Sequence, residues 1–292
     1  MLGREGPVSE AGTIEGAAHG HSRNGRQRPL KSALEARKAL LLSALVLAVL
    51  LGACQESRPT WDYVALGDSV PAGSGGVESY VSGYARFIEA DAGVSVRVHN
   101  LARDGIASGD LSRALRKNER FRKAVEKAEI VTVTIGFNDI GIPLDEFVGE
   151  SCGGRDNEKC FRDGLRKLKR NWLLILSELR RLTTGGSILI MTNDYSELPG
   201  NPSASNLDPH ALQVFASYLE EANSHRCTVA RKMDIPCADV YRAFNGSDGG
   251  QFPFKKGLLA NDGIRPSAKG NRVIASLLRD FGYEALSQPE PN

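Results

Sequence analysis

Short apolar segments alternate with amphipathic segments along most of the chain. The apolar segments typical of strands are residues 63–66, 94–98, 130–135, 187–191 and 235–240. Residues 130–135 form an unbroken, mainly β-branched run of the kind found in strands that are buried on both faces. Strands of this kind with helices between them predict an α/β fold, in which helices cover both faces of a parallel sheet.

Helical patterns fill the intervals between the strands. They cover residues 119–127, 161–182, 209–232 and 267–281. In residues 161–182 apolar side chains recur every three to four positions, which indicates one buried face and places Trp172 in the core. Pro209 suits the first turn of the next helix, and Ser267 suits the N-cap of the last. We expect one domain over residues 61–287, since 292 residues with 41% hydrophobic side chains suffice for such a core.

An apolar run at residues 39–50 follows basic residues near the N-terminus. The run is too short to span a bilayer and is typical of the hydrophobic region of a signal peptide. It ends at small residues followed by Cys54, which resembles the lipobox of bacterial lipoproteins, where the cysteine is diacylated and becomes the mature N-terminus. We therefore expect a disordered extension over residues 1–30, a lipoprotein signal peptide over 31–53 and a linker over 54–60.

The predicted signal peptide implies a protein that is exported and held at the membrane through a lipid on Cys54. An ordinary secretory signal with an incidental cysteine is the alternative. The net charge of +2 comes from the N-terminal segment, because residues 54–292 hold 30 basic and 31 acidic side chains. A nearly neutral mature domain gives no reason to expect a nucleic-acid partner.

Four cysteines remain after Cys54, and they fall into two close pairs. Cys152 and Cys160 lie eight residues apart, and Cys227 and Cys237 lie ten apart. Four cysteines allow three pairings, of which proximity favours Cys152–Cys160 and Cys227–Cys237. Exported proteins meet an oxidising compartment, so we expect disulfides here. A zinc site would need tighter, CxxC-like spacing or a set of histidine ligands, and neither is present.

Polar, glycine-bearing segments follow the predicted strands or precede the last helix. They are residues 67–69, 100–105, 136–139 and 262–266. Ligands bind at the carboxyl ends of the strands in parallel sheets, so these segments are expected to meet. Ser69 suits a nucleophile, and its own N–H, the N–H of Gly105 and the amide of Asn138 could receive an oxyanion. Each segment alone is more typical of an ordinary turn, but the four together indicate a catalytic site.

The set of four segments resembles the conserved blocks of the SGNH, or GDSL, hydrolases. The matching positions are Gly67-Asp68-Ser69, Gly105, Gly136-Phe137-Asn138-Asp139 and Asp262-Gly263-Ile264-x-Pro266. The resemblance spans nearly the whole predicted domain and implies a flavodoxin-like, three-layer α/β/α sandwich. It also implies an ester hydrolase without a cofactor, which acts on acyl esters, lysophospholipids or acetylated glycans. Ser69 would be the nucleophile, Ser69, Gly105 and Asn138 the oxyanion hole, and Asp262 the residue that orients the base. We expect a monomer.

One position departs from the family pattern. The pattern is Asp-x-x-His-Pro, and here Arg265 stands where the catalytic histidine belongs. Arginine stays protonated at any workable pH and has no acceptor lone pair, so it cannot take the proton of Ser69. Loss of one triad member leaves roughly 10³–10⁴-fold catalysis over water, so we expect impaired activity.

Three other histidines are candidates to replace the missing base. A buried structural role suits His99, and surface roles suit His210 and His225, although His210 is the best outside candidate. Two functions therefore stay open: an exported esterase with weakened or rerouted catalysis, and an inactive lipoprotein of the same fold that binds an ester, a glycan or an anion. A transporter's solute-binding lipoprotein fits the lipobox but not the segment around Ser69.

Overall fold

The computed structural model of the chain describes residues 37, 38, 40, 58–73, 78–183, 186–198 and 200–286. The extension over residues 1–30, most of the predicted signal peptide and Cys54 lie outside the described residues, so export and lipidation stay predictions. Among the described residues, no helix is long and apolar enough to cross a membrane.

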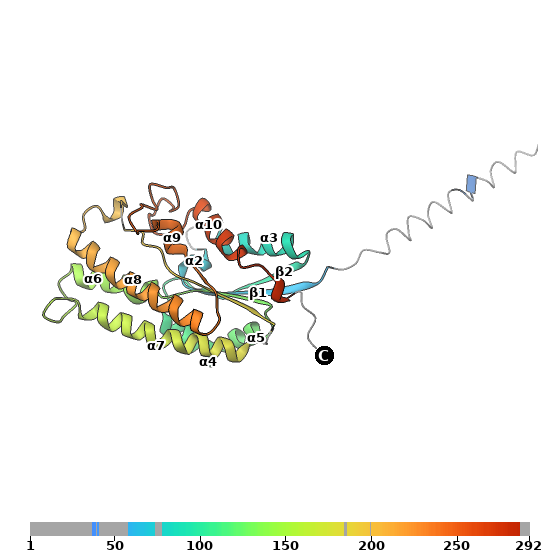
Figure 1. Cartoon of the computed structure of the whole chain (residues 1–292), viewed down its shortest axis with the longest axis horizontal. Coiled ribbons are helices and arrows are strands. Elements are labelled where there is room, and N and C mark those ends of the chain that lie inside the picture. The colour runs from blue at the N-terminus through green and yellow to red at the C-terminus, as the bar shows by residue number, and fades with distance from the viewer. Residues whose placement is uncertain are drawn as a thin grey trace, which may run out of the picture. The chain divides into compact units, whose positions relative to one another are not determined.

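Within this part of the chain, five parallel strands form one sheet in the order β2-β1-β3-β4-β5. The sheet lies between two layers of helices (Figure 1). The strands are β1 (Thr60–Gly67), β2 (Ser95–Asn100), β3 (Ile130–Thr134), β4 (Ile188–Thr192) and β5 (Cys237–Ala238). Because β1 lies between β2 and β3, the chain passes to one side after β1 and to the other side after β2. Ligand sites of open α/β sheets lie at such a change of direction.

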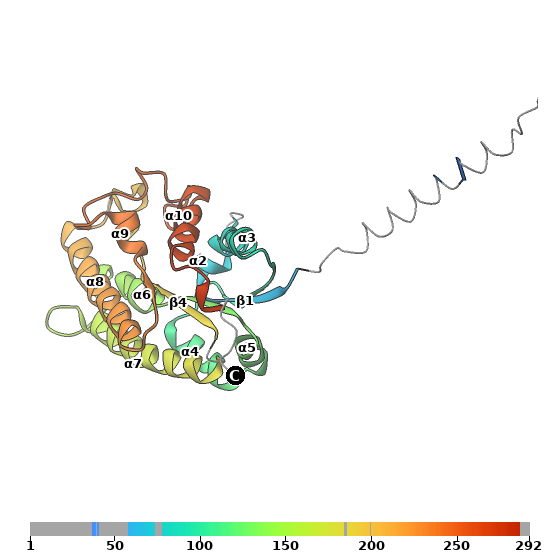
Figure 2. The same ribbon diagram turned by 45° about the vertical axis from the view of Figure 1, so that its right-hand side comes forward.

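Helices cover both faces of the sheet (Figure 2). They are α2 (Ser69–Ala72), α3 (Tyr80–Ala92), α4 (Ser108–Lys117), α5 (Glu119–Glu126), α6 (Phe137–Val148), α7 (Lys159–Leu182), α8 (Pro209–Lys232), α9 (Val240–Asn245) and α10 (Ala268–Arg279), with short 3-10 turns at Pro202–Ala204 and Glu284–Leu286. The sheet lies between α3, α9 and α10 on one side and α4, α5 and α7 on the other (Figure 1). Successive side chains of a strand point to opposite faces, so Tyr63 of β1 packs with α3 and α10 while Val64 packs with α4, α5 and α7. The predicted three-layer α/β/α fold is confirmed.

The predicted elements agree with the structure except at the last strand and in several helices. The prediction for residues 209–232 matches α8, and that for 161–182 differs from α7 by two residues. The strand predicted over residues 235–240 is wrong at both ends, because Pro236 has no N–H for a ladder and Asp239 already caps α9 through the N–H of Arg242 at 3.0 Å. Helices α2, α3, α4, α6 and α9 were not predicted.

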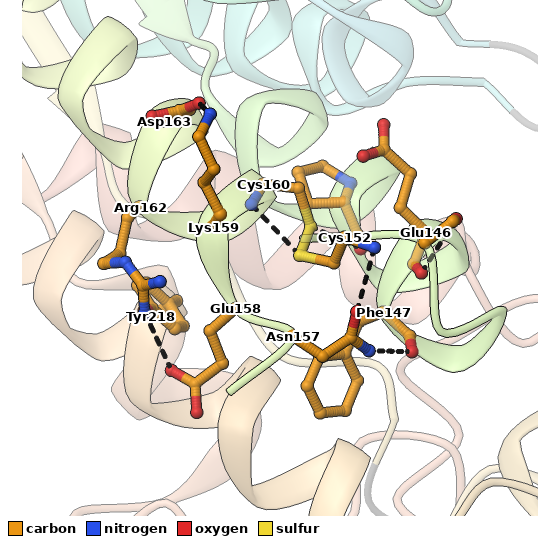
Figure 3. The surroundings of a disulfide bond; sticks show 12 residues. Glu146, Phe147, Cys152, Asn157, Glu158, Lys159, Cys160, Arg162, Asp163 and Tyr218 are labelled. Atoms are coloured by element: carbon orange, nitrogen blue, oxygen red, sulfur yellow. Dashed lines mark hydrogen bonds and ion pairs between the residues drawn. A yellow bond between two sulfur atoms is a disulfide. The ribbon is translucent and has the colours of Figure 1, made fainter. Parts of the chain in front are cut away.

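Two disulfides link neighbouring elements. Cys152–Cys160 closes the loop between α6 and α7, with Cα atoms 4.9 Å apart (Figure 3). Asn157 braces this loop by accepting from the N–H of Cys152 at 3.0 Å and donating to the carbonyl of Phe147 at 2.8 Å. Cys227–Cys237 joins α8 to β5, with Cα atoms 5.3 Å apart. This is the pairing that sequence proximity favours.

Gly67 ends β1 at the point where the backbone of β3 comes closest. Its φ is 146°, a value that favours glycine, and a Cβ atom there would collide with the carbonyl oxygen of Thr134. The next N–H, that of Asp68, donates to the same carbonyl at 3.1 Å. Glycine at this position therefore lets the turn into Ser69 lie directly against β3.

We predict that Gly67→Ala lowers the free energy of unfolding by about 1–3 kcal/mol, because the added methyl group forces the two strands apart. Urea unfolding measures the change. Gly186→Ala is the matched control, since nothing lies within 4 Å of a Cβ atom added at Gly186. Equal stability of the two variants would contradict the steric argument.

Candidate active site

Ser69 is the first residue of the short helix α2, directly after β1. Asp68 caps this helix by accepting from the N–H of Val70 at 3.2 Å, and it is itself almost fully buried. Ser69 is half-buried and faces a small cavity of about 30 Å³. A serine held at the carboxyl end of a strand, in the first turn of a helix, is well placed to attack a bound carbonyl group.

The cavity draws its walls from loops that are far apart in the sequence. It is lined by Asp68, Ser69, Val70, Phe137, Asn138, Asp194, Tyr195, Glu197, Ile264 and Arg265. These residues follow β1, β3 and β4 or precede α10, so the cavity opens at the carboxyl edge of the sheet. Ser69, Asn138 and Arg265 of the predicted site line it together, whereas Gly105 and Asp262 are not among the lining residues.

Asn138 lies in the first turn of α6, and its amide is fixed by the loop that carries Gly105. The Nδ2 atom of Asn138 donates to the carbonyl of Ile106 at 2.8 Å. An amide nitrogen carries two hydrogens, so a second N–H is left for a ligand in the cavity. Gly105 precedes Ile106, has a φ of 74° and is exposed. The geometry therefore ties two of the predicted oxyanion donors to each other.

Arg265 is held between two carboxylates. Its Nη1 atom donates to Asp262 at 3.0 Å, and its Nη2 atom donates to Asp104 at 3.3 Å. The hydrogen bond to Asp262 raises the pKa of Arg265 further above its ordinary value, although burial opposes it. Asp262 also accepts from the N–H groups of Ile264 and Arg265. Partial burial works against ionisation of Asp262, but these hydrogen bonds lower its pKa. Position 265 therefore places a fixed cation on the cavity wall where the family pattern has a histidine that accepts a proton.

No histidine of the described residues is among those that line the cavity. His99 contacts Asp62 at 2.9 Å and its side chain is 36% exposed, so the prediction of a buried histidine is wrong. The reason is that His99 lies on β2, an edge strand that has a neighbouring strand on one side only. His210 is exposed, and its ring lies 5.9 Å from that of Phe147. In α8, burial and then the charge of Lys169 lower the pKa of His225.

Residues 63–278 of the chain match the GDSL-like lipase/acylhydrolase family. The chain belongs to this family of ester-acting hydrolases. The match spans β1 to α10 and therefore includes every element that contributes to the cavity. No curated protein matches the sequence.

Solved structures of GDSL-like fold cover most of this chain. A lipase from a goat rumen metagenome aligns over 76% of this chain and 98% of its own, at 23% identity and a TM-score of 0.63. An acetylxylan esterase from Geobacillus stearothermophilus aligns over 79% and 99%, at 18% identity and a TM-score of 0.54. An α/β hydrolase from the metagenome of Lake Arreo, Spain, aligns over 79% and 98%, at 17% identity and a TM-score of 0.56. At these identities the likeness shows the fold.

A buried ion pair adjoins the cavity of this GDSL-family chain, and no sequence pattern predicted it. Arg226 of α8 is fully buried and donates to Asp194 at 2.6 Å and to the carbonyl of Ile135 at 2.7 Å. Asn223 bonds to both members of the pair. The only sequence signal is that Arg226 falls on the apolar face of α8, four positions after Ala222. The pair compensates two charges that burial removes from solvent, so the loss of either partner leaves the other uncompensated.

A second buried carboxylate fixes α6 against α4. Asp139 accepts from the N–H and from the hydroxyl of Ser108, both at 2.8 Å. Burial nevertheless raises the pKa of Asp139, and these two hydrogen bonds offset part of that rise. Because Asp139 directly follows Asn138, this contact also fixes the start of α6 and hence the amide that faces the cavity.

Glu197 lines the cavity as a buried carboxyl group. It is 7% exposed, and within the described part of the chain its Oε2 atom has no hydrogen-bond partner. Burial raises the pKa of Glu197 to about 8, and the negative charge of Asp194 adds to the rise. A buried carboxyl group with a free oxygen in a cavity beside Ser69 is available for chemistry or binding.

We predict that Arg226→Met lowers the free energy of unfolding by about 3–5 kcal/mol, because it leaves Asp194 buried without its partner. In urea unfolding, the double variant with Asp194→Asn should lose less than the sum of the two single variants. Lys169→Met, which breaks an exposed pair with Glu221, is the control and should cost less than about 1 kcal/mol. Additive losses would show that the buried pair is not coupled.

The raised pKa of Glu197 predicts a loss of stability as the pH rises. Between its ordinary value of 4.5 and about 8, the folded state keeps a proton that the unfolded state releases, so the free energy of unfolding falls across this window. Glu197→Gln removes that dependence, on the order of a few kcal/mol at most. Urea unfolding of both proteins from pH 5 to pH 9 measures it; parallel curves would mean that Glu197 titrates normally.

Proposed function

We propose that this chain is an exported serine ester hydrolase in which Ser69 is the nucleophile and Arg265 replaces the usual base. The observation that carries the proposal is that Ser69, Asn138 and Arg265 line one cavity within a GDSL-family domain. Ser69 would attack the ester carbonyl, and the developing oxyanion would be received by the N–H groups of Ser69 and Gly105 and by the amide of Asn138. Such donors stabilise the transition state even where proton transfer is poor.

The loss of the histidine makes the expected turnover low. Arg265 is paired with Asp262 and Asp104, so it holds the loop before α10 in place but accepts no proton. The same two pairs weaken the alternative of an inactive protein that binds an anion, because a ligand would have to compete with two carboxylates for the guanidinium. An esterase with impaired proton transfer is the function that the geometry supports best.

Export and lipid anchoring remain part of the proposal. They rest on the apolar run at residues 39–50 and on Cys54, and the two disulfides of the domain suit an oxidising compartment. The substrate would be a small acyl ester, a lysophospholipid or an acetylated glycan. One fold relative is an acetylxylan esterase, which supports the last class.

We predict low turnover of p-nitrophenyl acetate by the wild-type protein, no turnover by Ser69→Ala, and a gain of roughly 10²-fold in kcat/KM for Arg265→His, because histidine restores a base near neutral pH. Arg113→His, which changes an exposed arginine paired with Asp110, is the control and should leave turnover unchanged. Wild-type activity that survives Ser69→Ala would contradict the site, and no gain in Arg265→His would contradict the role of position 265.

A further inference from the structure

Ester hydrolysis by Ser69 needs a proton acceptor, and position 265 does not supply one. The titratable groups on the cavity wall, other than Arg265, are Asp68, Asp194, Tyr195 and Glu197. Each of these could receive or relay a proton only if its oxygen atoms are not already committed. Their hydrogen bonds therefore decide which one serves.

Two of the four are committed to structural contacts. Asp194 is bound to Arg226 at 2.6 Å, so its carboxyl group is already committed to a buried ion pair. Tyr195 donates its hydroxyl hydrogen to the carbonyl of Ile264 at 2.7 Å. Burial, and then the charge of Glu197, raise the pKa of Tyr195 well above its ordinary value, so the phenol stays neutral.

Asp68 and Glu197 each have one buried oxygen without a partner in the described part of the chain. Asp68 uses its other oxygen to cap α2, a helix of only four residues that begins at Ser69. Its carboxyl group is thus part of the support of the nucleophile. Glu197 lies in the segment after β4 and lines the same cavity, and within the described part of the chain no hydrogen bond or ion pair joins its side chain to another element.

We propose that Glu197 is the general base that accepts the proton of Ser69 in this chain. The inference rests on the proposed role of Ser69 as the nucleophile. The charged groups that line the same cavity as Glu197 are Asp194 on its own segment, Asp68 directly before α2 and Arg265 before α10. A carboxyl group in this setting has the proton affinity of a working base, since its pKa is raised to about 8 instead of 4.5.

The reaction balances with water as the only co-substrate. The Glu197 carboxylate takes the proton of the Ser69 hydroxyl as Oγ bonds to the acyl carbon. The resulting carboxylic acid then gives that proton to the leaving alcohol as the ester C–O bond breaks. In the second half, Glu197 takes a proton from water as the water oxygen attacks the acyl-serine, and it returns a proton to Ser69 as the acid leaves. Ester and water become acid and alcohol.

The test compares the pH dependence of kcat/KM for p-nitrophenyl acetate in the wild type, Glu197→Gln, Arg265→His and the double variant. We expect wild-type kcat/KM to rise with pH through about 8, because the carboxylate is the active form. Glu197→Gln should lose about 10²-fold or more at pH 9 and lose the rise. In the Arg265→His background the same change should cost only a few-fold, because histidine takes over the proton transfer.

Three further arms make the result decisive. Glu146→Gln changes an exposed glutamate of α6 and should leave kcat/KM unchanged. Glu197→Asp keeps a carboxyl group and should retain part of the alkaline activity that Glu197→Gln lacks. The double variant also serves as the folding control, since its activity shows that glutamine is tolerated at position 197.

The assignment to Glu197 would be overturned by an equal loss from Glu197→Gln in both backgrounds, which would indicate a structural role only. It would also be overturned if the alkaline rise persisted in Glu197→Gln and disappeared in Asp68→Asn. Activity that survives Ser69→Ala would instead overturn the nucleophile, and with it the proposed function, so the two failures are distinguishable.

Discussion

The parallel pairing of β1 with β3 sets the position of the residues that face the cavity. Gly67 lies in register with Thr134, and the close contact between their backbones places Ser69 at the same edge of the sheet as Asn138. A side chain at Gly67 would separate the two strands and with them the nucleophile and its amide donor. The hydrogen bond from Asp68 to Thr134 then fixes the turn into α2. Backbone geometry thus organises the cavity before any side chain of the site acts.

Charge pairing on the cavity wall decides what chemistry that geometry can perform. Arg226 neutralises Asp194 beneath the cavity, and Asp262 and Asp104 hold Arg265 at its side. Both arginines are therefore paired with carboxylates, and neither can accept a proton. Glu197 carries the acid–base capacity that remains. A histidine at position 265 would keep Asp262 as its orienting partner. The base could therefore change from Glu197 to that histidine through one substitution that leaves the fold intact.

Several features of the fold were predictable from the sequence because their signals are local. The β-branched run predicts the strand β3, and the three-to-four spacing of apolar residues predicts the helix α7. The four polar segments predict a site at the carboxyl edge of the sheet. Glu197 and Arg226 gave no such signal. Their significance depends on burial and on partners that only tertiary packing brings near: Arg226 meets Asp194 across 32 residues, and Glu197 acquires its raised pKa from the cavity around it. The burial of His99 was wrongly predicted for the same reason, since only the strand order shows that β2 is an edge strand.

The central claim is that Ser69 is a nucleophile in a preformed oxyanion site although no histidine of the described residues lines its cavity. Covalent labelling tests this most directly: the folded protein is incubated with a fluorophosphonate above pH 8, digested, and the modified residue is identified by mass spectrometry. The account predicts a single phosphonyl adduct on Ser69 that is absent when the protein is unfolded first. An unmodified Ser69, or an adduct on another serine of the folded protein, would contradict it.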